Sequence, residues 1–205
     1  MINDKKSGLL YGTFCADALS LGVHWIYDTQ ELEEKHGRIT HYKTPGPESY
    51  HPRKLAGDQG HVGDQSLCLL NYLKKEKRWE AVGFMDDWLG MWPDYHDYID
   101  GATKSTLANL QNQSDKTLGG SDSVEIAGPA RIAPLLTFLA DFSEEEVVRA
   151  AVEQTILTHR SKEAEESATF LAQAGHRLIH GANLLDTLRE TAPEWALAQA
   201  NSVLE

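Results

Sequence analysis

Gly60-His61-Val62-Gly63-Asp64-Gln65-Ser66, followed directly by Leu67-Cys68-Leu69-Leu70-Asn71-Tyr72-Leu73, is the most informative stretch of this chain. A loop broken by glycines delivers one carboxylate, Asp64, to the start of an apolar helix, where unpaired backbone N–H groups collect. This position suits a helix cap, an anion or a metal ion. Local sequence alone favours the cap, because Asp is a preferred N-cap residue and is stabilised by the helix dipole.

The composition is that of a globular protein with one core. The chain has 205 residues, of which 41% are hydrophobic and 24% charged, and we expect a single domain over residues 1–205. A formal net charge of -12 argues against nucleic acid as a partner, and no apolar run is long enough to predict a membrane span. The N-terminus lacks the pattern of a signal peptide, so we expect a cytoplasmic protein in which Cys15 and Cys68 are reduced packing residues.

The hydrophobic periodicity is helical throughout and predicts an all-α fold. Apolar residues between Ser7 and Trp25 recur at helical spacing. Ser143 followed by Glu144-Glu145-Glu146 forms a capping box that opens a second helix. A third helix is expected from Ser161 to Gly181, and Pro193 is expected to open a last short one that carries Trp195 and Leu197.

One long segment, Gly37 to Gly63, resists the helical interpretation because it contains three prolines and several glycines. A connection of this length without regular structure usually binds something or is mobile. It carries His41, His51 and His61, which suits a loop folded over a cleft; a disordered excursion is the alternative.

Three further segments place polar groups where helix packing does not require them. Ala16-Asp17-Ala18-Leu19 puts a carboxylate inside an apolar helix, which is costly unless the carboxylate is paired or liganded. A flexible loop, Gly119-Gly120-Ser121-Asp122-Ser123, leads to Arg131-Ile132-Ala133-Pro134, and Thr158-His159 marks a junction between two helices.

Taken in order, these segments resemble the ADP-ribosylglycohydrolase family. The family pattern has a Gly-Asp-Ala-Leu-Gly first helix, a Thr-Asp-Asp-Thr-like turn, a Ser/Gly-rich loop ending in Arg-Ile-Ala-Pro, and a Thr-His junction. The counterparts here are Ala16-Asp17-Ala18-Leu19-Ser20, Gly63-Asp64-Gln65-Ser66, Arg131-Ile132-Ala133-Pro134 and Thr158-His159. The resemblance runs from Ser7 to about Gly181.

The resemblance implies a compact all-helical domain that holds two magnesium ions and cleaves an ADP-ribosyl or related N- or O-glycosidic bond. Its substrate would be a nucleotide-sugar or an ADP-ribosylated group. The implied residues are, for catalysis, Asp64 and Asp17; for substrate binding, Gly119, Gly120, Ser121, Arg131 and His24; and for the metal, Asp64 and Gln65.

The chain also departs from that pattern. Gln65 replaces the second carboxylate of the turn, His24 falls where active members have a glutamate, and the family's last Asp-rich block has no counterpart before Glu205. The resemblance therefore implies weak or absent magnesium binding. These departures are similar to the J-type crystallin branch, which leaves a non-catalytic relative that binds a ligand or is structural as the alternative to a hydrolase.

The apparent lack of the family's C-terminal helices predicts an exposed apolar face. We expect either a homodimer that uses the region of Leu9, Leu10, Leu184 and Leu188, or a C-terminal segment that folds back to cover that face.

Several single residues keep two interpretations. His24 is either a ligand or proton carrier, or a hydrogen-bonded group at a helix end. Trp88 and Trp92 form either a wall for an adenine ring or a packed helix face. Arg131 either meets a diphosphate or pairs with an internal carboxylate such as Asp17.

Overall fold

The computed structural model describes residues 4–193, and over this part of the chain the fold is all-α, as the sequence predicts. Its α-helices are α1 (Asp4–Leu21), α2 (Thr29–His36), α3 (His61–Glu76), α4 (Ala81–Met91), α5 (Gly101–Leu110), α6 (Ala133–Phe138), α7 (Glu144–Ile156), α8 (Lys162–Ile179) and α9 (Leu184–Thr191). Two 3-10 turns, η1 (Lys116–Leu118) and η2 (Pro129–Arg131), and one isolated β-bridge between Ser121 and His159 complete the regular structure of residues 4–193. None of the described helices is long and apolar enough to cross a membrane.

The predicted helix ends are confirmed where capping chemistry is strong. Ser143 and Glu146 form the capping box at the start of α7, and the Ser161 hydroxyl accepts from Ala164 N–H at the start of α8. After α8, Gly181 has a φ of 98°, and the N–H groups of Gly181 and Ala182 donate to the carbonyls of Leu178 and Arg177. This is a Schellman motif, in which glycine supplies the left-handed backbone.

Two local predictions are wrong. α1 ends at Leu21, not at Trp25, because residues 22–25 form turns and Trp25 has a φ of 69°. Asp64 is not the cap of α3: the helix begins at His61, its N-cap is Gly60 without a side-chain hydrogen bond, and Asp64 lies inside the first turn. Its carboxylate is therefore free to contact groups outside the helix.

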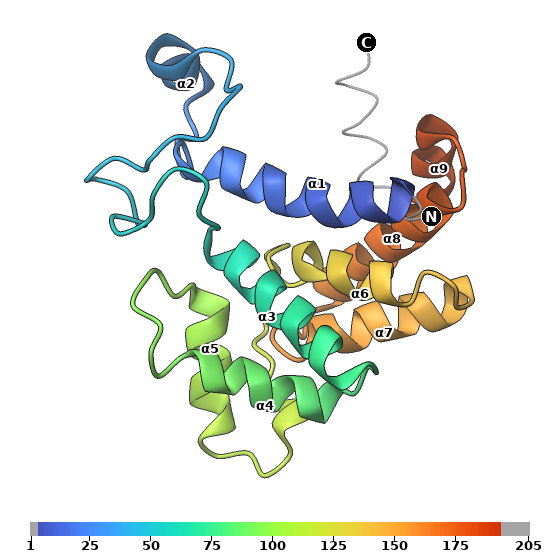
Figure 1. Ribbon diagram of the computed structural model, residues 1–205. Helices are drawn as coiled ribbons and strands as arrows, with labels where there is room; N and C mark the ends of the chain where they lie inside the picture. Colours follow the sequence, from blue (N-terminus) through green and yellow to red (C-terminus); the bar gives the residue numbers. More distant parts are fainter. Residues whose placement is uncertain (1–3, 194–205) are drawn as a thin grey trace.

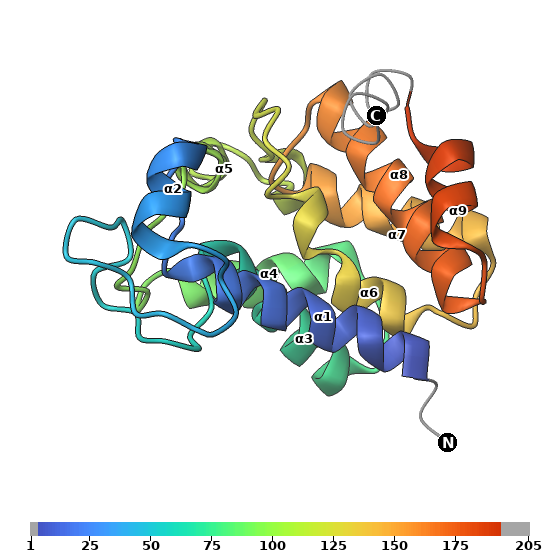
Figure 2. The same cartoon turned by 90° about the horizontal axis from the view of Figure 1, so that it is seen from above.

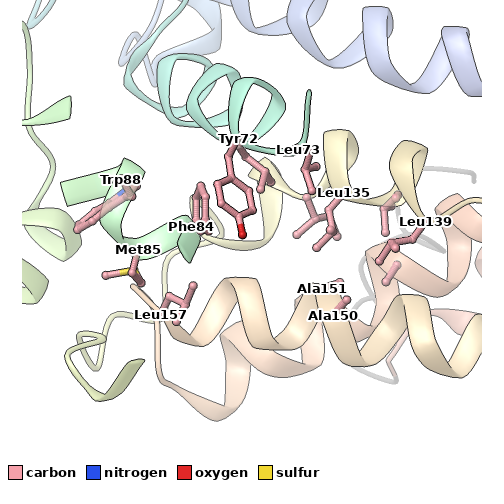
Figure 3. Packing of buried hydrophobic residues seen from close by; sticks show 14 of the residues in the cluster. Tyr72, Leu73, Phe84, Met85, Trp88, Leu135, Leu139, Ala150, Ala151 and Leu157 are labelled. Atoms are coloured by element: carbon pink, nitrogen blue, oxygen red, sulfur yellow. The ribbon is translucent and has the colours of Figure 1, made fainter. Parts of the chain in front are cut away.

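The hydrophobic core lies where α3, α4, α6 and α7 meet (Figure 3). Tyr72, Phe84, Met85, Trp88 and Leu135 are each no more than 2% exposed. Trp88 and Trp92 both belong to this core, so they form a packed helix face. Large aromatic side chains account for much of the apolar area buried there.

The two cysteines differ. Cys68 packs against the core, and burial raises the pKa of its thiol to about 11. Cys15 is exposed, so the expectation that both cysteines are packing residues is wrong for Cys15.

The arrangement places the long loop and α9 at opposite ends of α1 (Figures 1 and 2). α1 packs on α3, α6 and α8, and α7 packs along α8. The loop from Gly37 to Gly60 has no regular structure and brings the chain from α2 back to α3. The predicted irregular segment is therefore confirmed except for its last three residues, His61 to Gly63, which form the start of α3.

Leu184 is exposed and Leu9, Leu10 and Leu188 are half-buried, so the homodimer through this face remains a prediction. The expected helix with Trp195 and Leu197, and with it the alternative that this segment covers the face, lies outside the described residues.

Candidate functional site

A cavity of about 720 Å³ opens where the C-terminal end of α1 meets the first turns of α3 and α5. Polar and aromatic side chains line the cavity together with the segment 124–127. Tyr27, Val124 and Ile126 are more than half exposed although apolar, so the mouth of the cavity offers apolar surface to solvent. The charged and aromatic residues of the lining include Asp17, His24, Trp25, His61, Tyr98 and Asp100.

Asp17 is the carboxylate of α1 that faces this cavity. Its Oδ2 accepts a hydrogen bond from Gly60 N–H at 2.6 Å, which ties α1 to the start of α3. Gly63 allows the approach, because a Cβ on it would collide with the Asp17 carboxylate. Burial raises the pKa of Asp17 and the Asp64 charge adds to this, although the N–H of Gly60 opposes both. The helix therefore carries a carboxyl group with increased proton affinity at the cavity wall.

The turn after α1 presents His24 and Trp25 to the same cavity. Their rings stack with centroids 3.8 Å apart, and Tyr98 contacts Trp25 edge to face at 4.8 Å. Trp25 adopts the left-handed backbone region, which is unfavourable for a bulky residue and is found preferentially at functional sites. Burial, with a contribution from His51, lowers the pKa of His24 to about 4, so this imidazole is neutral at pH 7.

Two further histidines lie beside His24. His51 comes from the long loop and is fully buried, and His61 is the first residue of α3. His51 Nδ1 lies 3.0 Å from Asp97 Oδ1, and His61 Nε2 lies 3.7 Å from Asp100 Oδ2. Burial lowers the pKa of His61 to about 4, although Asp100 opposes this.

Asp100 is a second carboxylate in the cavity wall and the N-cap of α5. It accepts hydrogen bonds from both the N–H and the hydroxyl of Thr103, at 2.7 and 2.9 Å. Burial alone would raise the pKa of Asp100, but these hydrogen bonds together with His61 and Arg131 outweigh it and lower the pKa. Asp100 is thus held as an anion at the same wall as Asp17.

Asp64 is near this site but faces elsewhere. Its Oδ2 accepts from Lys54 Nζ at 2.6 Å and from the Tyr95 hydroxyl at 2.7 Å. Asp64 lines a separate surface depression with Asn71 and Asp87, among others. Of the residues that the family resemblance implies for the site, Asp17 and His24 therefore line this cavity, whereas Asp64 is absent from its described lining although its charge acts on Asp17.

Gln65 and Arg131 form a buried network instead of a ligand site. Gln65 Oε1 accepts from both Trp88 Nε1, at 2.8 Å, and Arg131 Nη1. Arg131 also donates to the Thr158 hydroxyl, and burial lowers the pKa of its guanidinium to about 10. Among the described residues no hydrogen bond or ion pair joins Arg131 to Asp17, and the internal carboxylate on which its charge acts is Asp100. Arg131 is buried and absent from the cavity lining, which does not suit contact with a diphosphate.

The first part of the predicted substrate-binding loop packs against the protein interior, and only its later part lines the cavity. Gly119, Gly120 and Ser121 are absent from the described lining of the cavity. Ser121 donates its N–H and hydroxyl to the Thr158 carbonyl, and a Cβ on Gly120 would collide with the Ile156 carbonyl. The loop reaches the cavity only further along, at residues 124–127.

The side chains around Asp64 do not fit the magnesium site that the sequence resemblance implies. Mg²⁺ requires about six oxygen ligands in near-octahedral geometry. One oxygen of Asp64 already accepts from an ammonium and a phenol, and the Gln65 oxygen accepts two donors.

Sequence reasoning missed Asp100, His51 and His61 as site residues. The sequence shows three histidines in the long segment, His41, His51 and His61. Nothing in the neighbouring residues distinguishes His51, which is buried, from His41, which is exposed. Asp100 before Gly101-Ala102-Thr103 has the pattern of a helix cap, which it is, and that pattern does not indicate a cavity.

Comparison with known proteins gives a consistent family. The model of the family described as ADP-ribosylglycohydrolase matches residues 2–205. A solved structure titled "ADP-ribosylglycohydrolase-related protein complex" superposes with a TM-score of 0.73 at 23% sequence identity and covers 95% of this chain. This likeness concerns the fold, and our chain spans 65% of the length of that one. No match is found among curated proteins.

Proposed function

We propose that this chain, which belongs to the ADP-ribosylglycohydrolase family, hydrolyses the N- or O-glycosidic bond of an ADP-ribosyl group or a related nucleotide-sugar in the cavity beside Asp17. Family membership and fold support a glycohydrolase-like protein. The choice of cavity, bond and residues is our proposal.

The observation that carries the proposal is the pair of carboxylates in one cavity wall. Asp17 has increased proton affinity because of its burial, whereas Asp100 is anchored by hydrogen bonds from Thr103. Glycoside hydrolysis typically uses one carboxyl group to protonate the leaving group and a second, ionised one to activate water or to stabilise positive charge at the anomeric carbon. We assign the first role to Asp17 and the second to Asp100.

The aromatic surface beside the carboxylates supports a nucleotide-sugar as the ligand. Trp25 and Tyr98 both line the cavity, and a planar base or the apolar face of a sugar can pack against this aromatic surface. At about 720 Å³ the cavity lies within the usual range for small-molecule sites.

The proposed site differs from a magnesium-dependent one. At Asp64 the positive charge comes from Lys54, so we propose a remodelled centre in which magnesium binds weakly or not at all. Activity should then persist in the presence of a chelator.

The second candidate function is ligand binding without turnover, as in a crystallin-like relative. The salt bridge between Lys54 and Asp64 favours it, because it occupies the carboxylate that the family resemblance assigns to catalysis. The two candidates predict the same binding and differ in turnover.

The test combines calorimetric titration of ADP-ribose with a hydrolysis assay on N- and O-linked ADP-ribosylated peptides. Asp17→Asn keeps an oxygen for the Gly60 N–H, and it should lower the rate by about 10²–10⁴-fold, the range for loss of a general acid. Asp94→Asn, at an exposed aspartate, is the matched control and should leave the rate unchanged. Binding without hydrolysis would select the second candidate, and absence of both would overturn the proposal.

A further inference from the structure

The three histidines beside the cavity have the arrangement of ligands around one ion. One ring nitrogen each from His24, His51 and His61 lies within 4.8 Å of the other two. The ring centroids are 5.5, 5.9 and 5.7 Å apart, a nearly equilateral triangle, and the rings are close to parallel. The centre of that triangle is about 3.3 Å from each ring, close to a metal–nitrogen bond of about 2.0–2.1 Å plus the roughly 1 Å from nitrogen to ring centre.

The buried nitrogens of this group lack partners. His51 Nε2 and His61 Nδ1 are both buried, and neither has a hydrogen-bond partner among residues 4–193. His51 is 0% exposed and His61 is 5% exposed. A buried polar atom without a partner costs free energy, and such atoms in a native structure call for an explanation such as an ion.

The opposite nitrogens of the two buried rings, His51 and His61, face carboxylates. His51 Nδ1 lies 3.0 Å from Asp97 Oδ1, and Asp97 also accepts from Tyr98 N–H, which fixes its position. His61 Nε2 lies 3.7 Å from Asp100 Oδ2. Metal-bound histidines usually have this partner on the opposite nitrogen, because a carboxylate fixes the tautomer and orients the ring.

From these three observations we infer that His24, His51 and His61 form a binding site for a divalent transition-metal ion, with zinc as the best match. His51 coordinates through Nε2 and His61 through Nδ1; Asp97 orients His51 by its contact with Nδ1, and Asp100 lies beside Nε2 of His61. Imidazole suits Zn²⁺ and other late first-row ions better than Mg²⁺, which prefers oxygen.

Three protein ligands leave one position of a tetrahedral ion for water or for an oxygen of a bound molecule. His24 and His61 line the cavity, so the fourth position is reached from there. The inference goes beyond the proposed hydrolysis and does not depend on it, because the protein can bind the metal whether or not it cleaves a glycosidic bond.

The test uses the full chain after treatment with a chelator, titrated with Zn²⁺ alone by calorimetry and with Co²⁺ by visible absorption. We expect one equivalent of Zn²⁺, and Co²⁺ absorption of the intensity that four-coordinate sites give. His24→Ala is the main variant, because His24 is only half-buried and its loss leaves the core intact. It should reduce Zn²⁺ affinity by at least about tenfold, and Asp97→Asn should reduce it by about 10–100-fold through His51.

Two controls separate this site from surface binding. His41→Ala removes an exposed histidine of the same long loop and should leave binding unchanged. His176 in the last turn of α8 and His180, its C-cap, are the competing pair, with ring centroids 4.3 Å apart, so the double variant His176→Ala/His180→Ala should also keep one equivalent. The inference is overturned if no Zn²⁺ binds, if His24→Ala binds as the unmodified chain does, or if binding disappears with the α8 pair.

Discussion

Lys54 Nζ lies 2.6 Å from Asp64 Oδ2, so the long loop is fastened to the first turn of α3 by a salt bridge that is largely shielded from solvent. The Tyr95 hydroxyl donates to the same oxygen at 2.7 Å, and burial together with this carboxylate raises the pKa of Tyr95. A carboxylate that the family resemblance assigns to a metal ion thus has a cation from its own chain. The positive charge beside Asp64 is thus the ammonium group of Lys54.

Lys54→Met should raise the affinity for magnesium and lower stability. The variant leaves the Asp64 charge with a hydrogen bond from Tyr95 alone, so a cation from solution gains an anionic site. Loss of a partly buried ion pair should lower the free energy of unfolding by about 1–2 kcal/mol. Calorimetric titration with Mg²⁺ and urea unfolding measure the two effects. Lys75→Met, at an exposed lysine paired with Asp87, is the control, and equal Mg²⁺ affinity in both variants would contradict the prediction.

Gln65→Leu should be strongly destabilising. Gln65 Oε1 is the shared acceptor for the Trp88 indole and the buried Arg131 guanidinium, and leucine leaves both donors without it. An uncompensated buried charge and N–H should cost about 3–5 kcal/mol in the free energy of unfolding. Gln111→Leu, at an exposed glutamine, should change stability by less than about 0.5 kcal/mol in the same urea titration. A small loss in Gln65→Leu would mean that this network is dispensable.

His159 should make the protein sensitive to acid. Its ring is fully buried, and burial, reinforced by Arg131 and opposed by Asp100, lowers its pKa to about 3. The unfolded chain protonates this histidine below pH 6.5, whereas the folded chain does so only near pH 3. Unfolding therefore takes up a proton in this window, and stability falls as the pH falls, by about 1.4 kcal/mol per pH unit once well below 6.5.

The loss of stability caused by His159 is absent above pH 6.5 and reaches its full size below about pH 3. Urea unfolding between pH 7 and pH 4 measures it, and His159→Gln should show a shallower dependence than the unmodified chain. His36→Gln, which removes the half-buried histidine in the last turn of α2, is the control variant and should keep the full slope. Parallel slopes for all three proteins would refute this account of His159.

Gly120→Ala and Gly90→Ala should have opposite effects on stability. A Cβ on Gly120 would collide with the Ile156 carbonyl, a backbone atom that cannot easily move, and the variant should lose about 1–3 kcal/mol. Nothing lies within 4 Å of a Cβ on Gly90 in α4, so alanine there should add about 0.5–1 kcal/mol. Thermal unfolding compares them. Destabilisation by Gly120→Ala, with unchanged ADP-ribose affinity in the folded fraction, would place this glycine in the scaffold and outside the binding site.

The all-α class and several helix ends are determined by the sequence alone. Hydrophobic periodicity reports which face of a helix is buried, and caps such as Ser143 with Glu146 or the glycine at 181 act within a few residues of themselves. The position of Asp17 inside an apolar helix also predicts a polar contact, and the structure provides one in the Gly60 N–H. Because these effects act between residues that are close in the chain, the local sequence determines them.

The partners of each polar side chain were decided only by the tertiary structure. The sequence predicts that Asp64 is a helix cap or a metal ligand. In the structure its carboxylate accepts hydrogen bonds from Lys54 of the long loop and from Tyr95, which follows α4. Gln65 and Arg131 are 66 positions apart and meet in the core. His24, His51 and His61 converge because the turn after α1, the middle of the long loop and the first residue of α3 meet at one place. Electrostatic and hydrogen-bond partners depend on distances in space, which separation along the chain does not determine.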